Sequence, residues 1–291
     1  MGGQQTSGGT GREFQRVADE LRFRMTNGTY PERSFLPSQR DLADEFRVSR
    51  VTVQRALREL INEGWIESKQ GSGSRVIKTQ RIQSSAPKAT RSRRGVTLEF
   101  LIGEAFEQPE VTLDVYTLTS ESLYWLIQQQ AHRIRSRSIS PRRITLRMLL
   151  PDERQSLPYP RVKDDPEDPR LRERLHDITE RHTKSLQESL GSLRSEGWVP
   201  SVDVDIRRAP LTPTFKLYLF NRVEALHGPY EVIERNIALE SGEELTALDV
   251  LGLGATLTHH IKDEQHQDSA GSIFVDSMQK WFNSVWELLS E

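Results

Sequence analysis

Apolar residues recur at helical spacing three times within the first 64 positions of the chain. The three sets are Phe14, Val17, Ala18, Leu21 and Met25, then Leu42, Ala43 and Phe46, and then Val53, Ala56, Leu57 and Leu60. The run 27–31 (Asn-Gly-Thr-Tyr-Pro) is suited to end the first helix, and Ser38 and Ser49 are suited to cap the second and third. The pattern predicts a core of three helices, the last two joined by a tight turn.

Two short segments after the third helix alternate as strands do. Trp65–Ser68 and Arg75–Ile77 flank the turn sequence Gln70-Gly71-Ser72-Gly73, and Gly64 is suited to end the preceding helix. We therefore expect a hairpin whose tip forms a wing beside the three helices.

The outward face of the third predicted helix carries groups that can recognise base edges. These residues are Arg50, Gln54, Arg55 and Arg58. A helix with an apolar inner face and guanidinium and amide groups on its outer face has the layout needed to enter the major groove of DNA.

The order of residues from Tyr30 to Gly73 resembles the winged helix-turn-helix domain of GntR-type bacterial transcription regulators. The matching segments are Tyr30-Pro31, 36–43 (LPSQRDLA), 48–53 (VSRVTV), 56–60 (ALREL), Glu63-Gly64 and 70–73 (QGSG). The resemblance implies that Arg40, Arg50 and Thr52 contact operator phosphates and bases, and that Gly71 lies against the minor groove. The full set of DNA-binding residues expected on this basis is Ser38, Gln39, Arg40, Ser49, Arg50, Thr52, Gln54, Arg55, Arg58, Gln70, Gly71, Ser72 and Gly73.

The chain departs from the usual pattern of that family at two positions. Arg47 stands where glycine is usual, so it must adopt a turn conformation that glycine adopts easily, or the turn has another shape. Gln54 stands where arginine is usual, and its amide suits adenine N6 and N7 better than guanine O6 and N7. We expect a shifted operator preference.

Charge is divided unevenly along the chain. Residues 1–95 contain 18 Lys and Arg against 10 Asp and Glu, whereas the remainder contains 22 against 32. The basic part suits a polyanion such as DNA, and the acidic part would be repelled by it. We expect a disordered tail over 1–11, a winged helix-turn-helix domain over 12–79, a basic linker over 80–96 and a second domain over 97–291.

The second domain alternates strands with helices, so it is not the all-helical effector domain of one branch of the family. Strands are predicted at Val111–Leu118, Arg143–Leu150, Val202–Arg207, Phe215–Phe220, Tyr230–Ala238 and Leu245–Leu251, and helices at Glu121–Arg135, Arg170–Ser195 and Ile273–Leu289. This order favours an α/β sandwich built on a mixed sheet.

One segment of the second domain resembles half of a phospholipase D-like domain. Thr214, Lys216, Asn221 and Gly228 have the spacing His-x-Lys-x4-Asp-x6-Gly of that superfamily, with Thr and Asn replacing the nucleophilic His and the Asp. Without an imidazole nucleophile we expect no hydrolysis, so the resemblance implies a disarmed site in which Lys216, Asn221 and Thr214 bind an anionic or polyhydroxylated effector. The alternative is a core strand that carries a lysine.

Other features narrow the functional classes. The chain has no cysteine, which excludes disulfides and thiolate metal sites, and we expect no metal and no cofactor. No run is long and apolar enough for a membrane helix, so we expect a cytoplasmic, nucleoid-associated protein. A histidine cluster at 259–266 and an arginine-rich stretch at 133–143 are weaker candidates for metal and anion binding.

These observations predict a regulator rather than an enzyme. We expect a ligand-responsive repressor that acts as a homodimer on an inverted-repeat operator, with an unknown small-molecule effector. Two alternatives stay open, namely an enzyme acting on phosphodiesters or phospholipids with a DNA-binding appendage, and a structural DNA-binding protein without an effector.

Overall fold

The computed structural model divides the chain into two compact units. It describes residues 7–26, 29–62, 64–69, 73–77, 82–84, 97–239, 243–250 and 256–291. The first unit comprises Met1–Thr79 with Arg235–Thr246 and Leu251–Gly254, and the second unit comprises the remaining residues.

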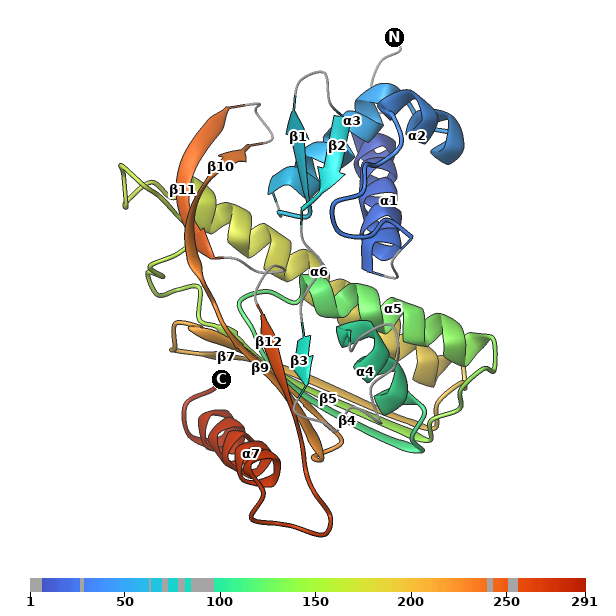
Figure 1. Ribbon diagram of the computed structural model, residues 1–291, viewed down its shortest axis with the longest axis vertical. Helices are drawn as coiled ribbons and strands as arrows, with labels where there is room; N and C mark the ends of the chain where they lie inside the picture. Colours follow the sequence, from blue (N-terminus) through green and yellow to red (C-terminus); the bar gives the residue numbers. More distant parts are fainter. Residues whose placement is uncertain are drawn as a thin grey trace. The chain divides into compact units, whose positions relative to one another are not determined.

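The first unit contains three helices and a two-stranded antiparallel hairpin (Figure 1). The helices are α1 (Ser7–Thr26), α2 (Gln39–Phe46) and α3 (Arg50–Asn62), and the strands are β1 (Ile66–Lys69) and β2 (Gly73–Val76). Phe35 forms an isolated antiparallel bridge with Arg75, on the edge of β2 opposite β1. Among the described residues, the three helices and the wing strands are those that the apolar pattern predicts.

The apolar faces of the three helices form one core. Leu21, Met25, Leu42 and Leu60 are fully buried, and Trp65 and Val76 extend the core beneath the hairpin. Removing such side chains from water provides the main stabilisation of a domain of this size.

The turn between α2 and α3 has the shape that glycine usually supplies. Arg47 ends α2 with φ 54° and ψ 45°, a left-handed conformation, and its backbone N–H donates to the carbonyl of Ala43. The first of the two alternatives for Arg47 is therefore correct: the turn keeps its shape and the arginine is strained.

The start of α1 corrects the expected tail. Residues 7–11 belong to α1, whereas residues 1–6 lie outside the described part of the chain. Once the amphipathic part of a helix is held by packing, each further residue adds one hydrogen bond without a new nucleation cost, which lets the helix extend into a polar segment.

The second unit is built on a seven-stranded mixed sheet with the strand order β3-β12-β9-β8-β4-β5-β7. Its strands are β3 (Ile82–Ser84), β4 (Glu110–Tyr116), β5 (Arg143–Pro151), β7 (Ser201–Ala209), β8 (Phe215–Phe220), β9 (Glu224–Pro229) and β12 (Leu257–Ile261). Strands β4, β5 and β7 are parallel to one another, and β8 and β9 join them to β12 through antiparallel pairs. A separate sheet contains β6 (Arg161–Val162), β10 (Val232–Ala238) and β11 (Glu244–Val250), and residues 235–246 of its last two strands are assigned to the first unit.

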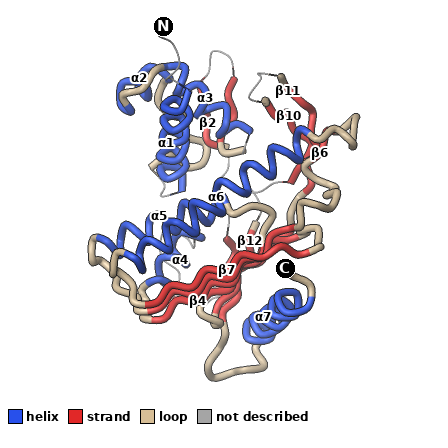
Figure 2. Tube along the Cα trace, turned by 180° about the vertical axis from the view of Figure 1, so that it is seen from behind, coloured by secondary structure: helices blue, strands red, loops and turns tan. Residues whose placement is uncertain are grey.

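Helices cover both faces of the seven-stranded sheet (Figure 2). One face carries α4 (Leu98–Phe106), α5 (Glu121–Arg135) and α6 (Arg170–Ser195), and the other carries α7 (Ala270–Leu288). Alternation along β8 turns Tyr218 and Phe220 toward the first face, and Leu217 and Leu219 toward α7. This layering agrees with the mixed α/β sheet that the order of segments predicts.

Five of the described elements beyond the first unit's helices and hairpin were not predicted, namely β3, β6, β9, β12 and α4, and β3 corrects the linker. Ile82–Ser84 forms the edge strand β3, in parallel pairing with β12, because Ile82 packs against the sheet's core. Residues 78–81 and 85–96 of the expected linker lie outside the described residues. Strands β9 and β12 and helix α4 occupy segments in which the sequence predicts no element.

Lys216 is a buried cation in this sheet. Its side chain is 4% exposed and its ammonium lies 5.4 Å from the centre of the Tyr230 ring. Burial lowers the pKa of Lys216 from 10.5 to about 8, although the nearby charge of Glu121 acts in the opposite direction. The protein therefore has a destabilising charge in its core at neutral pH.

We expect Arg47→Gly to stabilise the first unit by about 0.5 to 1 kcal/mol, because glycine adopts a positive φ without strain. Thermal or chemical denaturation of the purified protein measures this difference. Arg33, which also has a positive φ, provides the second position for comparison. A loss of stability in Arg47→Gly would mean that the arginine side chain contributes more than its backbone strain costs.

We expect Lys216→Met to stabilise the protein by about 1 to 4 kcal/mol at pH 7, because an apolar side chain avoids burying the ammonium. Between pH 8 and 10.5 the unfolded chain binds more protons at Lys216 than the folded chain does, so the stability of the original protein rises with pH there. The difference in free energy of unfolding between Lys216→Met and the original protein should be constant below pH 8 and should decrease above it. Urea denaturation over this pH range measures it. Lys184→Met, at an exposed position of α6, is the control, and a destabilised Lys216→Met would show that the ammonium's contacts outweigh its burial.

Candidate nucleic-acid interface

The second and third helices of the first unit are fixed at their N-termini by serine caps. The Ser38 hydroxyl accepts a hydrogen bond from the backbone N–H of Asp41 at 3.2 Å, and the Ser49 hydroxyl accepts one from Thr52 at 3.1 Å. Each serine thereby satisfies a donor that the first turn of a helix leaves open. The caps determine where α2 and α3 begin, and hence which residues lie in their first turns.

Packing divides α3 into a buried and an exposed face. Val53, Ala56 and Leu60 are completely buried, and Leu57 nearly so. The side chains on the opposite face are exposed; they are Arg50, Val51, Gln54 and Arg58. Their spacing of i, i+1, i+4 and i+8 places them in one continuous row that begins at the N-terminus of the helix.

Two residues predicted to contact DNA are not in this row. Thr52 is 2% exposed and its hydroxyl lies 2.9 Å from that of Ser49, so it completes the cap of α3. The guanidinium of Arg55 lies 4.1 Å from the centre of the Phe14 ring, so it packs against α1 although it is exposed. Periodicity alone did not distinguish these two positions from their neighbours.

The N-terminus of α2 contributes a second exposed group of predicted residues. Ser38, Gln39 and Arg40 are all exposed, and the Ser38 hydroxyl also donates to the Asp41 carboxylate at 2.7 Å. Backbone N–H groups at a helix N-terminus favour an anion such as a phosphate. The carboxylate of Asp41 beside Ser38 leaves Gln39 and Arg40 as the better donors.

The wing is described on both of its strands but not at its tip. Gly73 has φ 81°, a conformation that side chains other than glycine rarely adopt, and it pairs with Lys69. Gln70, Gly71 and Ser72 lie outside the described residues, so their predicted contacts with DNA stay predictions.

Two exposed apolar side chains were missed by the sequence reasoning. Val51 is 71% exposed at the start of α3, and Phe35 is 59% exposed beside the Arg75 guanidinium. The sequence signal for Val51 was its place one residue after Arg50, outside the apolar period of the helix. A large apolar side chain among polar groups on a binding face can contact another apolar group, such as the methyl of thymine.

The structure does not bring the expected effector residues together. Lys216 is buried near the start of β8, Thr214 is exposed before that strand, and Asn221 follows its far end. Lys216 and Asn221 are separated by about 17 Å at the usual strand rise of about 3.3 Å per residue. These three residues therefore do not line one site.

The residues of the phospholipase D-like spacing have structural roles instead. The Asn221 side chain accepts from the backbone N–H of Thr112 at 2.8 Å and donates to the carbonyl of Ala105 at 3.2 Å, and φ is 50°. A Cβ at Gly228 would come within 2.6 Å of the carbonyl oxygen of Thr256. Asn221 thus links the turn after β8 to β4 and α4, and Gly228 permits the close approach of two strands.

The weaker candidates for metal and anion binding contain side chains that pair with nearby carboxylates. His259 Nε2 lies 2.7 Å from the Glu224 carboxylate, and no group of metal ligands occurs among the residues that the structure describes. In the arginine-rich stretch, Arg133 pairs with Glu107 and Arg135 with Glu196. Within the described chain, no helix is long and apolar enough to cross a bilayer.

Comparisons with known proteins match part of the chain. The model of a family described as bacterial regulatory proteins, gntR family, matches residues 14–76. The uncharacterized HTH-type transcriptional regulator RB1450 of Rhizobium meliloti is 32% identical over 83 residues, 28% of this chain and 34% of that protein. The mannosyl-D-glycerate transport/metabolism system repressor MngR of Escherichia coli is 31% identical over 127 residues, 41% of this chain and 52% of that protein.

The solved structure of a GntR family transcriptional regulator from Listeria monocytogenes is 28% identical, covers 22% of this chain and 56% of its own, and has a TM-score of 0.22. The matches to RB1450 and MngR span only 34% and 52% of the length of those relatives. These comparisons do not support the resemblance of the second unit to phospholipase D. The family model agrees with the helices, caps and wing strands of the first unit, and residues 14–76 are a winged helix-turn-helix domain of the gntR family.

Proposed function

We propose that this protein is a sequence-specific DNA-binding transcription regulator whose α3 enters the major groove. The observation that carries the proposal is the exposed row Arg50, Val51, Gln54 and Arg58 opposite a fully buried face, in a domain of the gntR family. A row that begins at the N-terminus of the second helix of a helix-turn-helix presents side chains of suitable length to base edges.

The side chains of the row suggest what they recognise. The Gln54 amide can donate to N7 and accept from N6 of adenine in a bidentate manner, and Val51 can contact the methyl group of thymine. Arg50 suits guanine O6 and N7 or a phosphate. An operator half-site with an A·T pair next to a G·C pair satisfies all three side chains.

Other exposed groups of the first unit are suited to the DNA backbone. Gln39 and Arg40 stand at the N-terminus of α2, where the helix dipole favours a phosphate. The wing, with Gly73 at the base of its tip, is suited to the minor groove. These contacts position the domain on DNA without selecting a sequence.

We further propose that the regulator acts as a homodimer on an inverted repeat and that a small-molecule effector controls it. One winged domain buries little surface on DNA, and two copies reading half-sites about one helical turn apart bind more tightly. The second unit would supply dimerisation and effector binding. We propose that the protein represses transcription, because MngR, one of the relatives, is named a repressor.

We expect Arg50→Ala to weaken binding to the operator by about 1 to 3 kcal/mol and to relax sequence preference, because it removes a charge-assisted contact to a base. Fluorescence anisotropy with operator and random duplexes at two salt concentrations measures both effects. Arg142→Ala removes the same charge from an exposed position of the second unit and should leave specificity unchanged.

If Arg50→Ala loses the same affinity for operator and for random DNA, Arg50 contacts a phosphate and not a base. If the original protein binds operator and random DNA equally, with the same salt dependence, the proposal of sequence-specific regulation is wrong.

We expect Val51→Ser to lower the preference for thymine over uracil at one operator position, because the hydroxyl replaces the apolar contact with the thymine methyl. The measurement compares operators that carry uracil in place of thymine, one position at a time, for both proteins. Val51 makes no such contact if the two proteins respond identically to every replacement.

A further inference from the structure

A charged cavity lies in the second unit, at the end of two parallel strands. It has a volume of about 720 Å³. Every residue that lines it has an ionisable side chain; they are Asp152, Glu153, Arg154, Arg172, Glu173, His176, Asp177, Glu180 and Arg208. The expected effector residues Thr214, Lys216 and Asn221 are not among them.

The position of the cavity follows from the topology of the sheet. Strand β5 ends at Pro151 and the parallel strand β7 ends at Ala209, so Asp152, Glu153 and Arg208 stand at the carboxyl edge of the sheet. Helix α6 provides the other wall. In α/β sheets the carboxyl ends of parallel strands are where small-molecule ligands usually bind.

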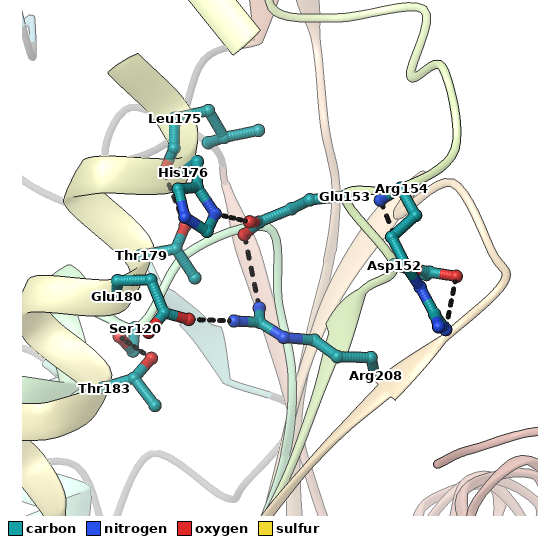
Figure 3. Close-up of polar contacts among 10 residues, drawn as sticks. All are labelled: Ser120, Asp152, Glu153, Arg154, Leu175, His176, Thr179, Glu180, Thr183 and Arg208. Carbon is teal, nitrogen blue, oxygen red and sulfur yellow. Dashed lines mark hydrogen bonds and ion pairs between the residues drawn. The ribbon is translucent and has the colours of Figure 1, made fainter. Parts of the chain in front are cut away.

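Ion pairs within the cavity hold its walls together (Figure 3). Glu153 accepts from His176 Nδ1 at 2.5 Å and pairs with Arg208 at 3.3 Å, and Arg208 also donates to Glu180 at 2.8 Å. This chain of contacts connects β7, the segment after β5 and α6. The hydrogen bond to Glu153 raises the pKa of His176, which favours the imidazolium form.

Three charged side chains of the cavity are not used by these pairs. Within the described part of the chain, the side chains of Arg172, Glu173 and Asp177 have no hydrogen-bond or ion-pair partner. All three lie on the face of α6 that lines the cavity, and Arg172 is half-buried. The structure thus holds one cationic group and two anionic groups that are available to a ligand.

We infer that this cavity binds a small zwitterionic molecule with more ammonium than carboxylate groups, of the class of basic amino acids. Arg172 would receive the carboxylate, since a guanidinium matches it in a bidentate manner, and Glu173 and Asp177 would receive the ammonium groups. Five carboxylates against three guanidinium groups line the cavity, so a net positive ligand is favoured even when His176 is charged.

The volume is sufficient for such a ligand. Small-molecule sites typically measure about 300 to 1,000 Å³, and the cavity lies within that range. Only the assignment of this molecule as the effector rests on the proposed function. Its binding to the cavity can be measured without DNA.

The experiment uses isothermal titration calorimetry of the full chain with three probes of similar length. L-Lysine carries two ammonium groups and a carboxylate, 1,5-diaminopentane lacks the carboxylate, and glutarate lacks the ammonium groups. We expect L-lysine to bind most tightly, 1,5-diaminopentane about tenfold or more weakly, and glutarate not measurably. Arg172→Ala should reduce the affinity for L-lysine to that for 1,5-diaminopentane. Asp177→Asn should lower the affinity for both amines.

Glu188→Gln, at an exposed position of α6 outside the cavity, is the matched control and should bind L-lysine as the original protein does. The inference is wrong if none of the probes binds at millimolar concentration, or if Arg172→Ala and Asp177→Asn bind like the control. Circular dichroism of the variants separates a lost contact from a lost fold. Operator binding by the same samples tests the proposed function separately, since it can fail while L-lysine still binds.

Discussion

The rotation of α3 about its own axis is the constraint on which the predicted DNA interface depends. Val53, Ala56 and Leu60 are completely buried against the other helices. Successive residues of a helix are separated by about 100°, so turning α3 by one position would expose apolar side chains and bury charged ones. Burial therefore selects Arg50, Val51, Gln54 and Arg58 for the outer face before any DNA is present.

The sequence could predict this face only as far as periodicity resolves it. The helices and the serine caps follow from local patterns, and the structure contains them. For the turn at Arg47 the sequence left two shapes open, and the structure has the strained one. Thr52 and Arg55 border the predicted face. The directions of their side chains depend on tertiary contacts that the spacing of apolar residues does not reveal. Thr52 turns inward to the Ser49 hydroxyl, and Arg55 is drawn to the Phe14 ring of a helix 41 positions earlier in the chain.

The second unit shows the same limit at larger scale. Long alternating segments were predicted because each buries a regular set of side chains. The strands β3 and β12 are shorter, β9 ends in Gly228-Pro229, and all three are defined by their pairing partners. The spacing that resembled phospholipase D is explained by unrelated structural needs. Asn221 bonds β4 and α4, and Gly228 makes room for Thr256, so a match of few residues did not indicate a shared site.

A buried ion pair of the seven-stranded sheet lies on the face that α7 covers. Asp114 on β4 is fully buried and accepts two hydrogen bonds from Arg147 on β5, at 2.8 and 2.5 Å. Gln279 of α7 donates to the same carboxylate and Asn283 of α7 accepts from Arg147. Because every charge here has a partner, the pair fixes α7 on the sheet without leaving an uncompensated ion.

The Asp114–Arg147 pair and the charged cavity differ in whether their charges are available to a ligand. Asp114 and Arg147 satisfy one another and the side chains of α7, as expected where burial makes an unpaired charge costly. In the cavity at the carboxyl edge, Glu153, Glu180 and Arg208 are likewise paired, but Arg172, Glu173 and Asp177 are accessible to water and bear no such cost. Water can be displaced from these three groups by a ligand of complementary charge, whereas a ligand at Asp114 would first have to break the contacts that hold α7.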